Sequence, residues 1–226
     1  MAPSSQSANA IHKMAEGACL TAKDAAFNLA DFINSSSMWA FRAVRECEKD
    51  LDNVEQQIDE RLPEAITRVS ETQARDLIAC LRFSIDLERI GDLLMSVAMH
   101  LQDMGNRLGP KDREQLSAMA QIVHRMLEQV NRAFLEQDLA IATEVLRTDS
   151  ELDKIRNELF QRHLRSTSRS SRGEHATNIL LVVQALERAG DHAKNLAEEV
   201  FHLVEGHSHR HVKLRKRTSR TQASAD

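Results

Sequence analysis

The chain has 226 residues, of which 42% are hydrophobic and 28% are charged, as is typical of a soluble protein with a real core. It contains only 7 Gly, 3 Pro and no Tyr, which favours long helices over strands. No stretch approaches the roughly 20 apolar residues of a membrane span, and the polar N-terminus lacks the pattern of a signal peptide. Cys19, Cys47 and Cys80 form no CxxC pair, which argues against a disulfide framework or a Cys-rich zinc site. We therefore expect a cytoplasmic protein.

The charge is concentrated unevenly along the chain. Residues 207–226 hold six Lys or Arg and one acid, Asp226, for a charge of +5, so the net charge of −4 leaves −9 for residues 1–206. An acidic body offers no broad basic face for nucleic acid, and none is expected as a partner. The tail could contact RNA, anionic lipid or an acidic partner surface, but a disordered solubilising tail is the simpler interpretation.

Residues 1–10 are expected to be a disordered lead, and helices are predicted from there on in chain order. The first runs over 11–33, and the second starts at Met38 after a polar break. Apolar residues recur along the second helix at steps of three and four, which marks one buried face, and Pro63 is expected to end or kink it. The third helix is predicted over 71–104, before Gly105, Gly109 and Pro110 mark a boundary.

The same succession of elements follows this boundary. Helices are predicted over 111–135, from about 139 to 164, and over 174–205, with a loop at 166–173 where the composition is rich in Ser and Arg. The fold class is therefore all-α, with two tandem three-helix bundles at 11–106 and 110–206 and a basic disordered tail at 207–226.

An internal repeat supports this division. Residues 87–92 (LERIGD) match 186–191 (LERAGD) at five of six positions, with an offset of 99. Residues 48–52 match 149–153 with an offset of 101, and both motifs come in the same order in each half. Because repeats fix architecture, the two halves are predicted to be duplicated units.

Each repeated motif carries two acids spaced four residues apart, which places both on one face of a helix. Glu88 and Asp92 fall within a predicted apolar stripe (Ile78, Leu81, Ile85, Met95 and Met99), so we expect them to face a neighbouring helix. Clustered carboxylates suit divalent cations or iron. Acids on a solvated helix face, neutralised by Arg89 and Arg188, are the alternative. The eight candidate metal ligands are Glu48, Asp52, Glu88, Asp92, Asp149, Asp153, Glu187 and Asp191.

The LERIGD and LERAGD segments, the latter followed by HAKNLAEEVFHLVEG, resemble the signature helices of the PhoU family of phosphate uptake regulators. The resemblance covers nearly all of residues 11–206. It implies two three-helix bundles, metal-binding E(D)xxxD motifs at the same eight acids, multinuclear iron clusters in some members, and a homodimer. It also implies negative regulation of phosphate uptake and of the phosphate-starvation response. The implied partners are the ATP-binding subunit of the phosphate ABC transporter and a PhoR-type sensor kinase, with membrane association only through partners.

Other functions remain open at this point. A di-iron oxidase needs two Glu-x-x-His motifs, and only Glu199 with His202 fits, so no enzyme is expected. A metal-free helical adaptor for a different transporter or partner is a second alternative. Nucleic-acid binding through the tail is a third, which deletion of residues 207–226 would abolish.

Overall fold

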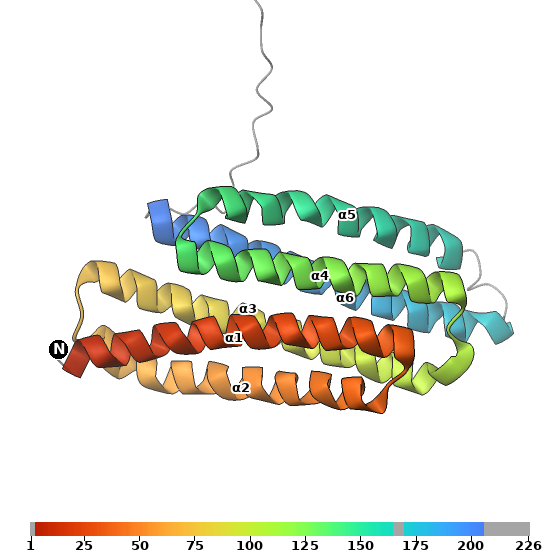
Figure 1. Cartoon of the computed structure of the whole chain (residues 1–226), viewed down its shortest axis with the longest axis horizontal. Coiled ribbons are helices and arrows are strands. Elements are labelled where there is room, and N and C mark those ends of the chain that lie inside the picture. The colour runs from red at the N-terminus through yellow and green to blue at the C-terminus, as the bar shows by residue number, and fades with distance from the viewer. Residues whose placement is uncertain (1–2, 165–169, 206–226) are drawn as a thin grey trace, which may run out of the picture.

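Six long helices and one short 3-10 helix make up the chain, as a computed structural model shows for residues 3–164 and 170–205 (Figure 1). The helices are α1 (Pro3–Ser35), α2 (Met38–Ile66), α3 (Glu71–Met104), η1 (Gly105–Arg107), α4 (Pro110–Glu136), α5 (Leu139–Leu164) and α6 (Ser170–Glu205). The predicted tail at 207–226 lies outside the described residues. No described helix is long and apolar enough to cross a bilayer.

Local sequence explains where the helices start and stop. Ser70 and Gln73 form a capping box at the start of α3, in which each side chain accepts a hydrogen bond from the other residue's backbone N–H. Pro110 occupies the first turn of α4, where its missing N–H costs nothing. Gly105 ends α3 with a φ of +56°, a conformation that glycine adopts without a steric penalty.

The helices form two three-helix bundles that share one core. Helices α1, α2 and α3 contact one another, and so do α4, α5 and α6. The halves meet where α1 packs on α4 and α3 packs on α6, while α2 and α5 lie at the two outer edges (Figure 1). Among the described helices α2 contacts only α1 and α3, and α5 contacts only α4 and α6. The outer helices are therefore each held by one half alone.

Side chains from both halves interlock at this shared interface. The ring of Phe134 on α4 lies 4.5 Å from Phe83 of α3 and 4.7 Å from His12 of α1, measured between centroids. Between α3 and α6, Arg82 donates to buried Glu199 at 2.7 Å. Apolar and ionic contacts together make the two halves a single packed body.

The all-α fold with two three-helix bundles is confirmed, but three local predictions are wrong in whole or in part. Helix α1 begins at Pro3, so residues 3–10 are helical rather than a disordered lead. Helix α2 continues past Pro63 to Ile66, so Pro63 does not end it, while the alternative of a kink stays a prediction. Helix α6 begins at Ser170, inside the predicted loop at 166–173.

Candidate functional site

The two repeated motifs form the same helix–helix contact in each half. A Cβ placed on Gly91 would lie 2.7 Å from Cδ1 of Leu51, and one placed on Gly190 would collide with Cδ2 of Leu152. The two contacts are related by the sequence offsets of 99 and 101 residues. Because each glycine has no side chain, a leucine of the outer helix can pack directly against its backbone. Helix α2 therefore lies close to α3, and α5 lies close to α6. This approach brings the acids of the paired helices together.

The first cluster lies across α2 and α3. Glu88 is mostly buried, with 18% of its side chain exposed, whereas Asp92 is about half exposed. Burial raises the pKa of Glu88, and the negative charges of Asp92, Glu55 and Asp52 raise it further, against the lowering effect of Arg89. The carboxylates therefore repel one another while they are partly removed from water.

Glu48 completes the first cluster from the α2 side. Burial raises the pKa of Glu48, and the charges of Asp92 on α3 and Asp52 on its own helix add to the effect. Arg89 forms the ion pairs of the α3 acids, at 3.4 Å to Glu88 and 3.6 Å to Asp92, and all three residues lie on α3. Within the described part of the chain, no ion pair joins α2 to α3 at this cluster, so no bridging cation offsets the repulsion across the two helices.

The second cluster lies across α5 and α6 and does contain bridging cations. Lys194 of α6 places its Nζ 2.9 Å from Asp149 of α5 and 3.3 Å from Asp191 of α6. Arg156 of α5 lies 3.8 Å from Glu187 of α6. Burial lowers the pKa of Lys194, but the bonds to Asp149 and Asp191 outweigh it and leave this pKa raised.

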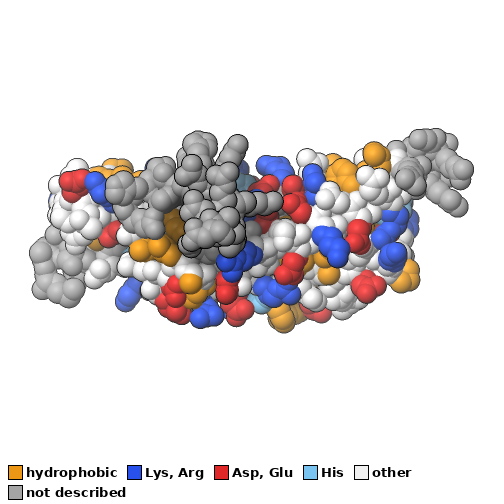
Figure 2. All heavy atoms as spheres, turned by 90° about the horizontal axis from the view of Figure 1, so that it is seen from above, with side chains coloured by type: hydrophobic (Ala, Val, Ile, Leu, Met, Phe, Trp, Pro, Cys, Tyr) orange, Lys and Arg blue, Asp and Glu red, His pale blue; other side chains and the backbone are white. Residues whose placement is uncertain are grey.

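Glu187 nevertheless remains in an acidic environment. Burial raises the pKa of Glu187, and the charges of Asp191, Asp153 and Asp149 raise it further, while Arg156 lowers it. Figure 2 shows the side of the molecule that carries α5, where acidic and basic side chains are interspersed. Charges of both signs therefore alternate on this side.

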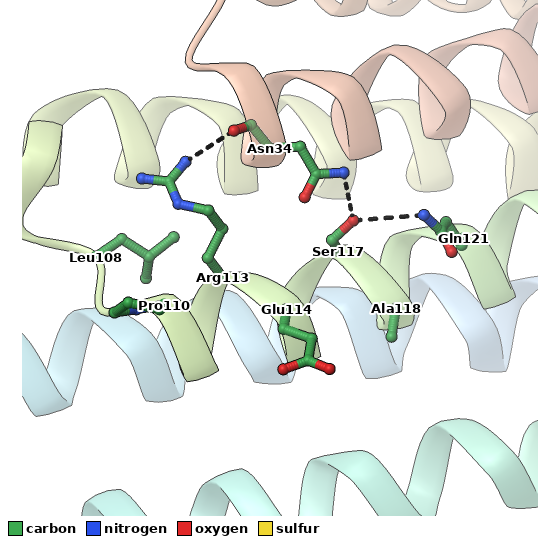
Figure 3. A pocket seen from close by; sticks show the side chains of 8 residues that line it. All are labelled: Asn34, Leu108, Pro110, Arg113, Glu114, Ser117, Ala118 and Gln121. Carbon is green, nitrogen blue, oxygen red and sulfur yellow. Dashed lines mark hydrogen bonds between the residues drawn. The ribbon is translucent and has the colours of Figure 1, made fainter.

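One hollow in the described part of the chain is separate from both clusters. It has a volume of about 650 Å³ and lies where the end of α1 meets the start of α4 (Figure 3). Arg113 donates to the carbonyl of Asn34 at its rim, and the Asn34 side chain donates to Ser117. Because Arg113 satisfies carbonyls at the end of α1, it serves as a helix cap.

Comparison with known proteins places the repeated units in a family. The PhoU domain matches residues 11–101 and 116–200, which together make up most of the chain. The chain belongs to the PhoU family. It is 31% identical over 172 residues to phosphate-specific transport system accessory protein PhoU homolog 1 of Thermotoga maritima, covering 73% of each chain. The PhoU homolog of Pseudomonas aeruginosa is 29% identical over 175 residues, covering 76% of this chain and 72% of the relative.

Solved PhoU structures share the fold. The crystal structure of PhoU from Pseudomonas aeruginosa superposes with a TM-score of 0.70 at 26% identity, covering 90% of this chain and 96% of the other. The phosphate transport system regulatory protein PhoU from Streptococcus pneumoniae superposes with a TM-score of 0.80 at 17% identity, covering 91% and 98%, which shows the fold alone. The resemblance to PhoU deduced from the LERIGD repeat is thereby confirmed.

The structure gathers the eight predicted PhoU acids into two groups of four, one in each half. It does not draw them together as a finished metal site: among the described residues, no three His, Cys, Asp or Glu side chains form a ligand group for one ion. The assignment of the eight acids as metal ligands therefore stays a prediction. The Glu199 of the incomplete Glu-x-x-His motif is engaged by Arg82.

The predicted apolar stripe of α3 is correct for Met95, which is buried, and for Leu81, which packs against the core, but wrong for the other three residues. Ile78, Ile85 and Met99 are 38%, 40% and 53% exposed. Because α3 contacts α1, α2 and α6, it buries a wide face, and the predicted stripe falls along its outer edge. The buried positions of this face include Phe83, Leu87, Ile90, Leu94 and Ala98.

Sequence reasoning also missed two participants. Arg156 and Lys194 pair with the acids of the second cluster. Their positions in the repeat could have indicated them, because offsets of 101 and 99 map Arg156 onto Glu55 and Lys194 onto Met95. Comparison of the acids alone did not include these neighbours.

The raised pKa of Glu88 predicts a pH-dependent effect of Glu88→Gln on stability. A carboxyl whose pKa is raised by folding destabilises the folded state as pH rises from its unfolded to its folded pKa. The metal-free variant should therefore be more stable than the wild type by a few tenths of a kcal/mol at pH 7. This difference should vanish below the ordinary pKa of 4.5, where both states are protonated.

Urea unfolding in the presence of a chelator, followed by circular dichroism from pH 4 to pH 8, measures this difference. Glu144→Gln removes an exposed carboxylate from α5 and is the matched control, with no comparable pH trend expected. A Glu88→Gln variant that is less stable than the wild type at pH 7 would contradict the repulsion inferred for the first cluster.

Proposed function

We propose that the chain is an accessory regulator of a phosphate-specific transport system that restrains phosphate uptake and the phosphate-starvation response. The observation that supports this proposal is the match of two PhoU domains to residues 11–101 and 116–200. Relatives that share 27–31% of their residues with the chain are named phosphate-specific transport system accessory proteins. The proposal is of a regulator and not an enzyme, acting in the cytoplasm on the transporter's ATP-binding subunit and a PhoR-type sensor kinase, as a homodimer.

The proposal includes metal binding by the clustered acids. Carboxylate oxygens are the ligands preferred by hard divalent cations and iron. The mutual repulsion of Glu48, Glu88 and Asp92 fits such an ion, because a cation between α2 and α3 would offset charges that the helices now hold together at a cost. Side-chain rotation at Asp52 and Asp92, which are both exposed, would complete a ligand set.

A bound ion would act on the surface that partners meet. Helix α2 contacts only α1 and α3 among the described helices, so a cation shared between α2 and α3 would fix its position. The exposed Trp39 and Met38 at the start of α2 would then be presented on a rigid helix. Metal occupancy would in this way control partner recognition.

A genetic experiment tests the regulatory role. The gene is deleted in the source organism, and phosphate uptake and expression from a phosphate-repressed promoter are measured at high phosphate. Deletion should raise both, and the wild-type gene should restore them. Unchanged uptake and expression after deletion would contradict the proposed function.

Metal content is a separate prediction. Purified wild-type protein is expected to retain iron, manganese or zinc, and Glu88→Ala combined with Asp92→Ala to lose it, because two of four carboxylates are removed. Elemental analysis after dialysis measures the content. Glu144→Ala combined with Asp138→Ala, two acids outside both clusters, is the control and should keep the metal. Equal metal in all three proteins would contradict the assigned ligands.

A metal-free helical adaptor for a different transporter is the second candidate. It is favoured by the observation that no three potential ligands come together among the described residues. Binding of the chain to the partner in the presence and absence of a chelator separates the two functions, because the adaptor should bind equally in both.

A further inference from the structure

The two acid clusters have the same backbone frame but different counter-charges. The glycine–leucine contacts, Gly91 with Leu51 and Gly190 with Leu152, fix the correspondence between the halves. Acids occupy all four equivalent motif positions in both halves, and Arg89 corresponds to Arg188. The halves also differ around the motifs. The first has Met95 and Glu55 where the second has Lys194 and Arg156, and it has Arg45 and Lys49, which lower the pKa of Glu48, where the second has Leu146 and Ser150.

The exchanges at Met95 and Glu55 add three positive charges to the second cluster, while the loss of Arg45 and Lys49 removes two beside the position of Glu48. Met95 to Lys194 contributes one, and Glu55 to Arg156 contributes two. In the structure both cations face acids across the α5–α6 contact: Lys194 reaches Asp149 at 2.9 Å, and Arg156 reaches Glu187 at 3.8 Å. At the matching place in the first half, Glu55 adds to the repulsion felt by Glu88.

We propose that Lys194 and Arg156 are built-in counter-cations that close the second cluster to metal, so that ion binding is confined to the first half. The inference rests on the proposed metal binding at Glu48, Asp52, Glu88 and Asp92. A metal at the second cluster would have to displace Lys194 from two carboxylates at once and then remain beside a partly buried ammonium group.

The two outer helices, α2 and α5, therefore differ in whether a metal ion is needed to hold them. Lys194 joins α5 to α6 in the way a bridging ion would, so α5 is fixed whether or not metal is present. Among the residues that the structure describes, no ion pair links α2 to α3 at the first cluster, so α2 depends on the ion for this link. The first half therefore responds to metal, while the second is a permanent scaffold.

Exchanging the two residue pairs between the halves tests the proposal. One variant, Lys194→Met with Arg156→Glu, gives the second cluster the residues of the first. The reciprocal variant, Met95→Lys with Glu55→Arg, gives the first cluster the residues of the second. Equilibrium dialysis of the full chain against Mn²⁺ counts the bound ions, and circular dichroism confirms that each variant is helical.

The number of bound Mn²⁺ ions should rise about twofold in Lys194→Met with Arg156→Glu and fall to near zero in Met95→Lys with Glu55→Arg. A wild-type protein whose binding is unchanged by Met95→Lys with Glu55→Arg, or lost on Asp149→Asn with Asp191→Asn, would overturn the inference while leaving metal binding itself intact. A wild-type protein that binds no Mn²⁺ would instead refute the metal part of the proposed function.

A metal-free measurement tests the counter-cations independently. In a chelator, Lys194→Met should lower the midpoint of urea unfolding, because Asp149 and Asp191 lose their bridge. This shift should shrink in high salt, which screens exposed charge pairs. An unchanged midpoint would overturn the inference whatever the Mn²⁺ result.

Discussion

Replacing Phe134 with alanine is expected to lower the free energy of unfolding by about 3–5 kcal/mol. Only 2% of Phe134 is exposed, and its ring lies 4.5 Å from Phe83 and 4.7 Å from His12. Phe134 belongs to the second half, whereas both partners belong to the first. The substitution would leave a cavity at the contact between the halves, which neither bundle can close without moving relative to the other.

Urea unfolding followed by circular dichroism measures this loss, and Leu135→Ala is the matched control. Leu135 is the next residue on α4 and is 46% exposed, so its truncation should change stability by no more than about 0.5 kcal/mol. If the halves unfold separately, Phe134→Ala should also split the single transition into two. Equal stabilities for the two variants would show that the contact between the halves does not contribute to the fold.

The fold was predictable because its signals are local and repeated. Apolar residues at steps of three and four set the helices, and Gly105 and Pro110 set the boundary between the halves. The errors arose where tertiary contacts outweigh local preference. Pro63 predicts a break, yet Leu62 and Ala65 on either side of it are buried, and their packing carries α2 on to Ile66.

The packing between the halves could not be predicted from periodicity. Apolar residues at steps of three and four indicate that a helix has a buried face. They do not indicate how many other helices pack against that face. Ile85 is 40% exposed because α3 turns its wide buried face to three other helices, and this depends on the docking of α6. The ion pair of Arg82 with Glu199, which are 117 residues apart, is outside the reach of any local pattern.

The candidate site was predictable in part. The duplicated motifs identify the acids, and the structure brings those of each half to one pair of helices. Their counter-charges were harder to identify, since whether Lys194 pairs with Asp149 or extends into solvent depends on side-chain geometry. The sequence shows that equivalent positions of the two halves hold residues of different charge. Only the distances in the structure show that the cations of the second half pair with its acids.

Replacing Gly190 with valine is expected to destabilise the protein by about 2–3 kcal/mol. A Cβ at this position would collide with Cδ2 of Leu152, and Leu152 is itself only 1% exposed. The sulfur of Met126 lies 3.9 Å from the same point, so the leucine cannot turn away into open space. Helix α5 must then move outward from α6, which would also lengthen the bridge from Lys194 to Asp149.

Gly17→Val is the control that separates crowding from the intrinsic effect of the new side chain. Gly17 lies within α1, and apart from the adjoining backbone of that helix no atom of the described residues lies within 4 Å of its added Cβ. Valine there should therefore be neutral or stabilising by a few tenths of a kcal/mol. Urea unfolding measures both variants. Because the collision at Gly190 involves a buried leucine, further replacement of Leu152 by alanine should recover part of the loss in Gly190→Val. Equal effects at Gly17 and Gly190, or no recovery with Leu152→Ala, would mean that close approach of α5 to α6 is not the reason for the glycine in this motif.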